Sequence, residues 1–511
     1  MSGEARPDKL EIKGGLIIRN TALNFLGLSL PLVVGLVAMP LTIRWLGLER
    51  FGVMSLVWVV FGYFSYIDLG LSMATTRFVA GALGRRDHDV IPRYIWTTVI
   101  AQLGLGSLGG IALALVTPML AEHILKIPTA LIGESKASLY LLALSLPVVL
   151  VTASFRGALE ARQRFDLVNL VKTPSSILNY ALPAVGAGLG FDLPAIILLL
   201  ILARFLTLLI WMAMVFRAFP NLRKGFTFHR GALKHVLGFG IWVMVSNGVG
   251  PFLVYLDRFL IGSLLTVGAV GFYTAPYEGV SRITIVPLSL VMTLFPMFSA
   301  LQAGQDREKE QAYFHGSVKF LIVTLGFVAV VLIFFAHPLL RIWLGPSFAE
   351  KSTVVFQILA AGFFLNSLSN VPYIYLQGIG RSDLVAKCHV TELIVYVPLL
   401  WLMIKTWGIA GAAGASAIRA AADMVLLFTF SVRKGGLNAS GLISAGTKRA
   451  GLAVAALATA GVLMKPVSWR IGAFAALVIA ALVVLGPRIF DAREKTWIGE
   501  NVSRLKARLR G

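Results

Sequence analysis

The chain has 511 residues, of which 57% are hydrophobic and 14% charged, and its mean hydropathy is +0.82. This composition excludes an ordinary soluble protein and indicates a polytopic membrane protein. The formal net charge of +22 does not indicate a nucleic-acid partner, because Lys and Arg fall in short clusters between apolar runs rather than in one basic domain.

A helix that crosses a membrane needs about 20 largely apolar residues. After a polar N-terminal tail, residues 1–16, the sequence predicts an all-α fold with about fourteen such helices. A basic amphipathic tail, residues 491–511, ends the chain. The predicted spans cover residues 17–43, 51–80, 93–118, 136–158, 168–190, 193–216, 236–260, 267–299, 316–337, 352–379, 387–405, 409–432, 447–465 and 470–488.

The basic residues predict the orientation, since Lys and Arg concentrate in cytosolic loops. Most of the 46 basic residues fall in alternate loops on the side that holds both termini. Examples are RFVAGALGRRDHDVIPR, residues 77–93, and RAFPNLRKGFTFHRGALK, residues 217–234. We therefore predict that both termini are cytosolic, which requires an even number of spans.

The second predicted span contains VFGYFSYIDLGLSMATTRFVAG, residues 60–81, which places Asp68 and Arg77 among apolar residues. In one ideal helix, nine residues turn the chain by about 180°, so these two charges would point to opposite faces. Arg77 lies near the cytosolic end, where it can anchor the helix at the interface. Two interpretations of Asp68 stay open: an acceptor for a basic partner such as Arg204, or an acid that titrates during transport.

Three arginines lie deep in later spans, where a charged side chain costs roughly 2.5–3.5 kcal/mol and marks a paired or functional position. Arg204 has no acid within its span, so it needs a partner from another helix or an anionic ligand. Arg282 follows Glu278 by four residues, and Arg419 precedes Asp423 by four. This spacing predicts two ion pairs, each on one helix face, which serve either as structural pins or as parts of a site.

Asp257 and Arg258 are adjacent at the outer end of the 236–260 span, so we expect a gate or anchor near the membrane interface. Glu392 lies about one turn inside the cytosolic end of its span, as a pairing residue or a coupling acid. The candidates for ion coupling are Asp68, Glu278, Glu392 and Asp423. The candidates for contacts with a sugar, with hydrogen bonds between helices as the alternative, are Asn24, Asn247, Asn366 and Asn370.

Two stretches share one placement at the end of a span, a Gly-containing turn and the start of the next span: IRWLGLERFGVMS from Ile43 and IGSLLTVGAVGFYT from Ile261. Six spans separate them, and an even number keeps both copies in the same orientation. We therefore predict two pseudo-symmetric lobes of six spans, with two extra C-terminal helices. The predicted parts are a first lobe at 17–217, a linker at 218–235, a second lobe at 236–432 and the extra helices at 433–490.

PLTIRWLGLERFGVMSLVWVVFGYFSYIDLGLSMATTRFVAG, residues 40–81, resembles the N-terminal signature of the polysaccharide-transporter branch of the MOP superfamily. YLDRFLIGSLLTVGAVGFYTAPY, residues 255–277, is similar to the signature of the seventh and eighth spans of that branch. The resemblance implies two lobes around a central cavity and transport by alternating access. It implies export of a polyprenyl-diphosphate-linked oligosaccharide, such as an O-antigen, exopolysaccharide or capsule unit, across the cytoplasmic membrane of a prokaryote.

In the related peptidoglycan-precursor flippases, cavity arginines bind the diphosphate and the last two spans form a groove for the lipid tail. The resemblance therefore makes Arg204, Arg282 and Arg419 candidate diphosphate contacts, and residues 433–490 a candidate lipid groove. It implies membrane lipids as partners, together with a polysaccharide polymerase and a chain-length regulator.

Two other functions compete with this one. A cation-coupled exporter of small amphiphilic molecules would share the fold but is expected to have an acidic cavity, whereas the deep charges here include three arginines. A membrane enzyme that polymerises or ligates glycans usually has large outer loops, and the predicted outer loops are short. The only cysteine, Cys388, rules out a cysteine-based metal site, and we expect neither a metal nor a cofactor.

Overall fold

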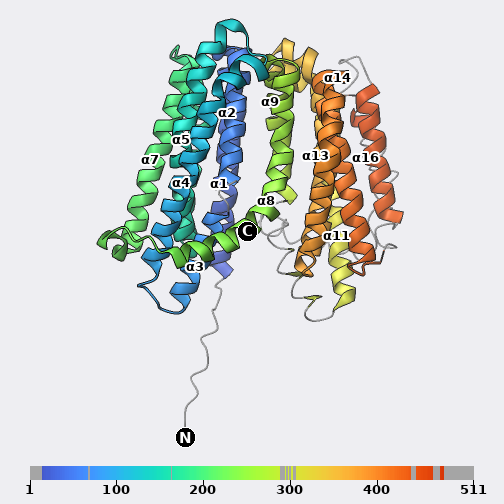
Figure 1. The fold of residues 1–511 in the computed structure, drawn as a ribbon. Helices are drawn as coiled ribbons and strands as arrows, with labels where there is room; N and C mark the ends of the chain where they lie inside the picture. Colours follow the sequence, from blue (N-terminus) through green and yellow to red (C-terminus); the bar gives the residue numbers. More distant parts are fainter. Residues whose placement is uncertain are drawn as a thin grey trace, which may run out of the picture. The chain divides into compact units, whose positions relative to one another are not determined.

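The computed structural model describes residues 14–66, 70–162, 164–287, 294, 297–298, 301–302, 306–438, 445–463, 472 and 474–476. Within these ranges, side chains are not described at 14–29, 63–66, 165, 224, 238–252, 254, 445 and 463. The described residues form helices and turns and contain no strand, so the predicted all-α fold is confirmed (Figure 1).

Where the structure describes residues of the predicted spans from 17–43 to 447–465, they lie mainly in helices. Most of the 470–488 span and the whole 491–511 tail lie outside the described residues. The α-helices are α1 (Gly14–Leu46), α2 (Leu48–Tyr66), α3 (Leu71–Gly84), α4 (Ile91–Met119), α5 (Ile132–Ala161), α6 (Phe165–Gly188), α7 (Leu193–Ala218), α8 (Arg230–Leu264), α9 (Val267–Ser281), α11 (Arg307–Phe334), α12 (Ala336–Trp343), α13 (Pro346–Gly378), α14 (Ser382–Arg433) and α16 (Ala445–Leu463). A π-helical turn, η1 (Leu120–Ile124), and the 3₁₀ turns η2 (Thr129–Leu131), η3 (Pro220–Lys224) and η4 (Arg282–Thr284) join them.

The exteriors of the helices are apolar. On α4 and α5, Leu108, Leu115 and Leu144 are 68, 76 and 75% exposed, which suits lipid rather than water. Six described segments are long and apolar enough to cross a membrane, and the chain is therefore a multi-pass membrane protein. They are Ile91–Ile124, Thr129–Ala161, Leu193–Ala218, Arg307–Phe334, Pro346–Gly378 and Ser382–Arg433.

The chain forms two compact units, residues 1–255 and 256–511. In unit 1, α5 packs against α2, α3, α4 and α7, while α6 packs against α1 and α7. In unit 2, α13 packs against α9, α11, α12 and α14. The boundary between the units lies inside α8, after the 218–235 segment that the sequence suggests as a linker.

Small residues allow the closest helix contacts in unit 1. A Cβ atom at Gly106 of α4 would lie 2.6 Å from the Cα of Pro147, and one at Gly110 would lie 2.5 Å from the carbonyl oxygen of Ala143. Both partners are on α5. The i, i+4 glycines therefore bring the two backbones together, as small residues commonly do between membrane helices.

The second predicted span is not one continuous helix. α2 ends at Tyr66 and α3 begins at Leu71, after Gly70, which has a left-handed backbone with φ of 64°. Only glycine adopts that conformation readily. The ideal-helix spacing assumed between Asp68 and Arg77 therefore does not continue across Gly70, and Asp68 itself lies outside the described residues.

α14 contains two predicted spans joined by a tight reversal. Gly408 has φ of 60° and ψ of −138°, which is not helical. Beyond this turn the two arms lie against each other, because the hydroxyls of Tyr396 and Ser416 are 3.0 Å apart. A hairpin of this kind places residues of the first arm beside residues about 20 to 34 positions later in the chain.

Candidate functional site

Unit 2 holds a buried charged cluster where α8 ends and α9 begins. Asp257 and Arg258 are 1 and 2% exposed. Tyr273 of α9 donates a hydrogen bond to Asp257, and the Arg258 guanidinium lies 4.0 Å from the ring centre of Tyr277. These two charges were expected near the membrane interface as a gate or anchor. Both side chains are buried against α9, and their place near the interface as a gate or anchor stays a prediction.

The same cluster continues to the predicted pair of Glu278, on α9, with Arg282, the first residue of the turn η4 that follows α9. Arg258 lies 3.5 Å from Glu278, and Arg282 donates to Glu278 at 2.9 Å. The pair expected from the i, i+4 spacing is therefore present. Glu278 serves two arginines, so neither guanidinium is without a counter-charge.

A second cluster crosses the α14 hairpin. Arg419 lies 3.5 Å from Glu392 on the other arm, and Asp423 lies 3.9 Å from His389. The predicted pair of Arg419 with Asp423 is therefore wrong, because Arg419 pairs with Glu392 across the hairpin instead. Glu392 takes the pairing role that its sequence position allowed.

Two carboxylates in this hairpin cluster are poorly satisfied. Glu392 and Asp423 are 6 and 5% exposed. Among the described residues, neither oxygen of Glu392 has a hydrogen-bond partner, and the same holds for Oδ1 of Asp423. Arg419 is thus within ion-pair distance of Glu392 but not of Asp423, and two buried acids with one such arginine favour a bound proton or cation.

The predicted sugar contacts are only partly visible. The side chains of Asn24 and Asn247 lie outside the described residues. Asn370 donates to the backbone carbonyl of Asn366 at 3.0 Å, within α13. Arg77 of α3 is exposed, and its guanidinium lies 6.0 Å from the ring centre of Phe78.

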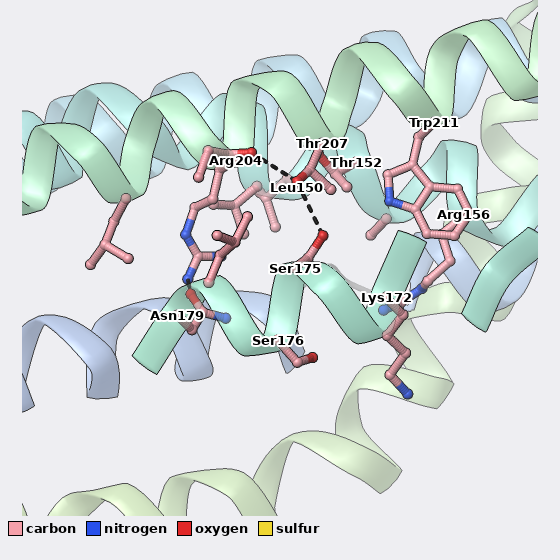
Figure 2. Close-up of a pocket in the computed structure, with 15 residues that line it drawn as sticks. Leu150, Thr152, Arg156, Lys172, Ser175, Ser176, Asn179, Arg204, Thr207 and Trp211 are labelled. Carbon is pink, nitrogen blue, oxygen red and sulfur yellow. Dashed lines mark hydrogen bonds between the residues drawn. The ribbon is translucent and has the colours of Figure 1, made fainter. Parts of the chain in front are cut away.

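Arg204 lies in a polar pocket of unit 1, between α5, α6 and α7 (Figure 2). Its guanidinium donates to Oδ1 of Asn179 at 3.0 Å and lies 3.9 Å from the ring centre of Phe61. Among the described residues, no carboxylate pairs with Arg204, and its Nε is shielded from solvent without an acceptor. Arg282 and Arg419 each pair with a carboxylate, whereas the partners of Arg204 among the described side chains are neutral.

The pocket contains functional groups that the sequence analysis did not identify. Its volume is about 290 Å³. Among the described residues, its polar lining has no acid and consists of three bases, four hydroxyls and one amide: Arg156, Lys172, Arg204, Thr152, Ser175, Ser176, Thr207 and Asn179. A signal was available in KTPSSILN, residues 172–179, a polar stripe at helical spacing within an apolar span.

No group of three or more His, Cys, Asp or Glu side chains in the described part of the chain is placed to hold a metal ion. The expectation of neither a metal nor a cofactor stays a prediction.

The arrangement of helices is similar to that in known structures. The chain is similar to an inward-facing multidrug resistance MATE family transporter of the MOP superfamily, with a TM-score of 0.66 and 16% identity, over 85% of this chain and 99% of that structure. It is also similar to the lipid II flippase MurJ in an inward closed conformation, with a TM-score of 0.65 and 15% identity, over 91 and 97%. At such identities the likeness shows the fold, which is that of MOP-superfamily membrane transporters.

Residues 17–302, more than half of the chain, match the polysaccharide biosynthesis protein family. The chain belongs to this family, as the resemblance in its first and seventh spans indicated. It is 28% identical over 411 residues to a putative O-antigen transporter of Shigella flexneri, covering 80% of this chain and 96% of that protein.

Proposed function

We propose that this protein exports a polyprenyl-diphosphate-linked oligosaccharide from the inner to the outer leaflet of the cytoplasmic membrane by alternating access. The observation that carries the proposal is the pocket around Arg204, whose described lining between membrane-spanning helices has three bases and no acid. Two of these bases, Lys172 and Arg204, have no carboxylate partner among the described residues, so the pocket attracts an anion. Membership in the polysaccharide biosynthesis family supports a glycan-linked anion.

A diphosphate suits this pocket chemically. The planar guanidinium of arginine presents parallel donors to pairs of phosphate oxygens and stays charged under all physiological conditions. Arg282 and Arg419 stay candidate contacts, but each already has a carboxylate within 3.5 Å. We therefore assign Arg204 the first diphosphate contact.

We further propose that protonation couples transport to an ion gradient. Glu392 and Asp423 support this role because both acids are buried with carboxylate oxygens that lack hydrogen-bond partners among the described residues. A bound proton would remove one of the two negative charges beside Arg419 and His389. A change of net charge in a buried cluster is a plain physical means of biasing one conformation over another. We expect both termini in the cytosol, and a polymerase and a chain-length regulator as partners.

The test of the cargo is translocation of a fluorescent polyprenyl-diphosphate oligosaccharide in proteoliposomes. We expect the wild type to move it and Arg204→Gln to reduce the rate at least about tenfold, since a lost charged hydrogen bond is worth about 1.5–3 kcal/mol. Lys234→Gln, which removes an exposed charge from α8 of the same unit, is the control and should transport normally. Export of a cationic dye in place of every diphosphate-linked glycan would replace our proposal with the small-molecule exporter.

The test of the coupling uses the same vesicles with an imposed pH gradient. We expect the gradient to accelerate the wild type, and Asp423→Asn or Glu392→Gln to remove that acceleration. Asp383→Asn changes an acid on the same helix that pairs with Arg381 at 3.0 Å and is 48% exposed at its side chain, so it should keep the response. Full pH dependence in both buried variants would rule out this site.

A further inference from the structure

The pocket in unit 1 has two cationic ends. On α6, Lys172, Ser175 and Asn179 recur at helical spacing, and on α7 Arg204 and Thr207 face them. The antiparallel register is set by Arg204 on Asn179 at 3.0 Å and by Thr207 Oγ1 at 3.1 Å from Ser175 Oγ. At 1.5 Å per residue, Lys172 and Asn179 are about 10 Å apart along the helix. Figure 2 shows Arg204 with Asn179 at one end, and Arg156 and Lys172 towards the other.

The more exposed end of the pocket is formed by residues of α5 and α6. Arg156 lies 3.5 Å from Glu160, four residues along the same helix, and its Nε is shielded without a hydrogen-bond partner among the described residues. Lys172 is exposed, and within the described chain no carboxylate forms an ion pair with it. Glu160 therefore offsets one of the three positive charges, and the pocket keeps an excess of two.

The space between the ends is lined by hydroxyls rather than by acids. Ser175 donates to the carbonyl of Val171 at 2.8 Å, and Thr207 donates to that of Ala203 at 2.8 Å. Ser176 and Thr152 add two more hydroxyls to the lining. Hydroxyls can rotate, so the O–H groups along this track can turn from the backbone carbonyls and donate to phosphate oxygens.

We propose that this pocket is a binding site for a diphosphate ester, with an exposed subsite at Arg156 and Lys172 and a deep subsite at Arg204 and Asn179. A single orthophosphate reaches one subsite, whereas two linked phosphates reach long side chains from both. The inference rests on the proposed function for the source of the diphosphate, the lipid-linked cargo. Under the predicted orientation, the exposed subsite lies near the cytosolic ends of α5 and α6, where such a cargo would arrive.

Binding can be measured without transport, on the full chain in phosphatidylcholine nanodiscs. Inorganic pyrophosphate and inorganic phosphate are the calorimetric probes. We expect pyrophosphate to bind at least about tenfold more tightly, and Arg204→Gln and Lys172→Gln each to weaken it about tenfold and remove the preference, as expected for one lost charged hydrogen bond. Arg204→Lys keeps the charge but loses the planar fork, so it should bind with intermediate affinity.

The outcomes separate specific recognition from bulk charge. Lys234→Gln also removes one positive charge from unit 1, so equal weakening by this variant would overturn the site. Absence of pyrophosphate binding to well-folded wild type would also overturn it. Displacement of pyrophosphate by a short prenyl diphosphate supports the proposal, whereas displacement only by nanodiscs containing phosphatidylglycerol would reassign the pocket to a phospholipid headgroup.

The binding assay and the transport assay together distinguish this inference from the proposed function. If the wild type binds pyrophosphate but does not transport the oligosaccharide, the proposed function is wrong and the site remains. Normal transport in Lys172→Gln and Arg204→Gln, with unchanged binding, would remove the site and leave the function.

Discussion

Each of the three deep arginines acts according to the partner that the fold gives it. Arg282 pairs at 2.9 Å with Glu278, four residues earlier in the chain. Arg419 pairs with Glu392 across a hairpin at 3.5 Å, and Arg204 meets the neutral Asn179 at 3.0 Å. A paired guanidinium neutralises an acid, whereas one with a neutral partner keeps its charge for a ligand.

This difference predicts a stability effect at Arg419. Arg419→Gln leaves the Glu392 carboxylate buried with no cation at 3.5 Å, which should destabilise the protein by about 3 kcal/mol. The measurement is the thermal midpoint of the purified protein in detergent.

The double variant Arg419→Gln with Glu392→Gln is the control, because it removes both charges. We expect it to recover most of the lost stability. If the double variant is as unstable as the single one, the two side chains do not form an energetic pair.

Helix contacts are decided by glycines that look alike in the sequence. Gly110 of α4 sits where an added Cβ would be 2.5 Å from the α5 backbone, whereas at Gly104 no atom lies within 4 Å among the described residues. Both are in the same helix, so helix propensity affects them alike.

We therefore expect Gly110→Val to force α4 and α5 apart at a cost of about 1–3 kcal/mol, and Gly104→Val to be tolerated. Fluorescence-detected size exclusion reports this as aggregation of the first variant and a monodisperse peak for the second. Equal behaviour of the two variants would show that close packing of α4 on α5 is not required.

The α14 hairpin depends on the backbone of Gly408. With φ of 60° and ψ of −138°, alanine is strained at this position by about 1–3 kcal/mol. Gly408→Ala should lower the thermal midpoint and weaken the contact of Arg419 with Glu392.

Gly451→Ala in α16 is a suitable comparison. It is helical, and no described atom would lie within 4 Å of its new Cβ, so we expect an unchanged or slightly raised midpoint. An unchanged midpoint in Gly408→Ala would show that the reversal tolerates other backbone conformations.

For the whole molecule, the distribution of Lys and Arg predicts the orientation, because basic loops are retained on the cytosolic side. A green fluorescent protein fused after Gly511 should fluoresce, and alkaline phosphatase fused there should be inactive. The opposite pattern would place the C-terminus outside and would require an odd number of spans.

A large share of this protein can be predicted from local sequence. Apolar runs of about 20 residues locate the helices, since length and hydropathy decide whether a segment can cross a bilayer. The pair of Glu278 with Arg282 follows from the geometry of one helix, which spacing determines. The family is visible in two stretches of sequence and is confirmed by the match over residues 17–302.

Tertiary structure decides whatever depends on contacts between helices. The arrangement of the hairpin gives Arg419 to Glu392 instead of Asp423, and α9 covers Asp257 and Arg258. The cationic pocket needs three helices in register, because Arg156, Lys172 and Arg204 come from α5, α6 and α7. Local spacing determines which residues share a face, but only the packing of helices determines what that face meets.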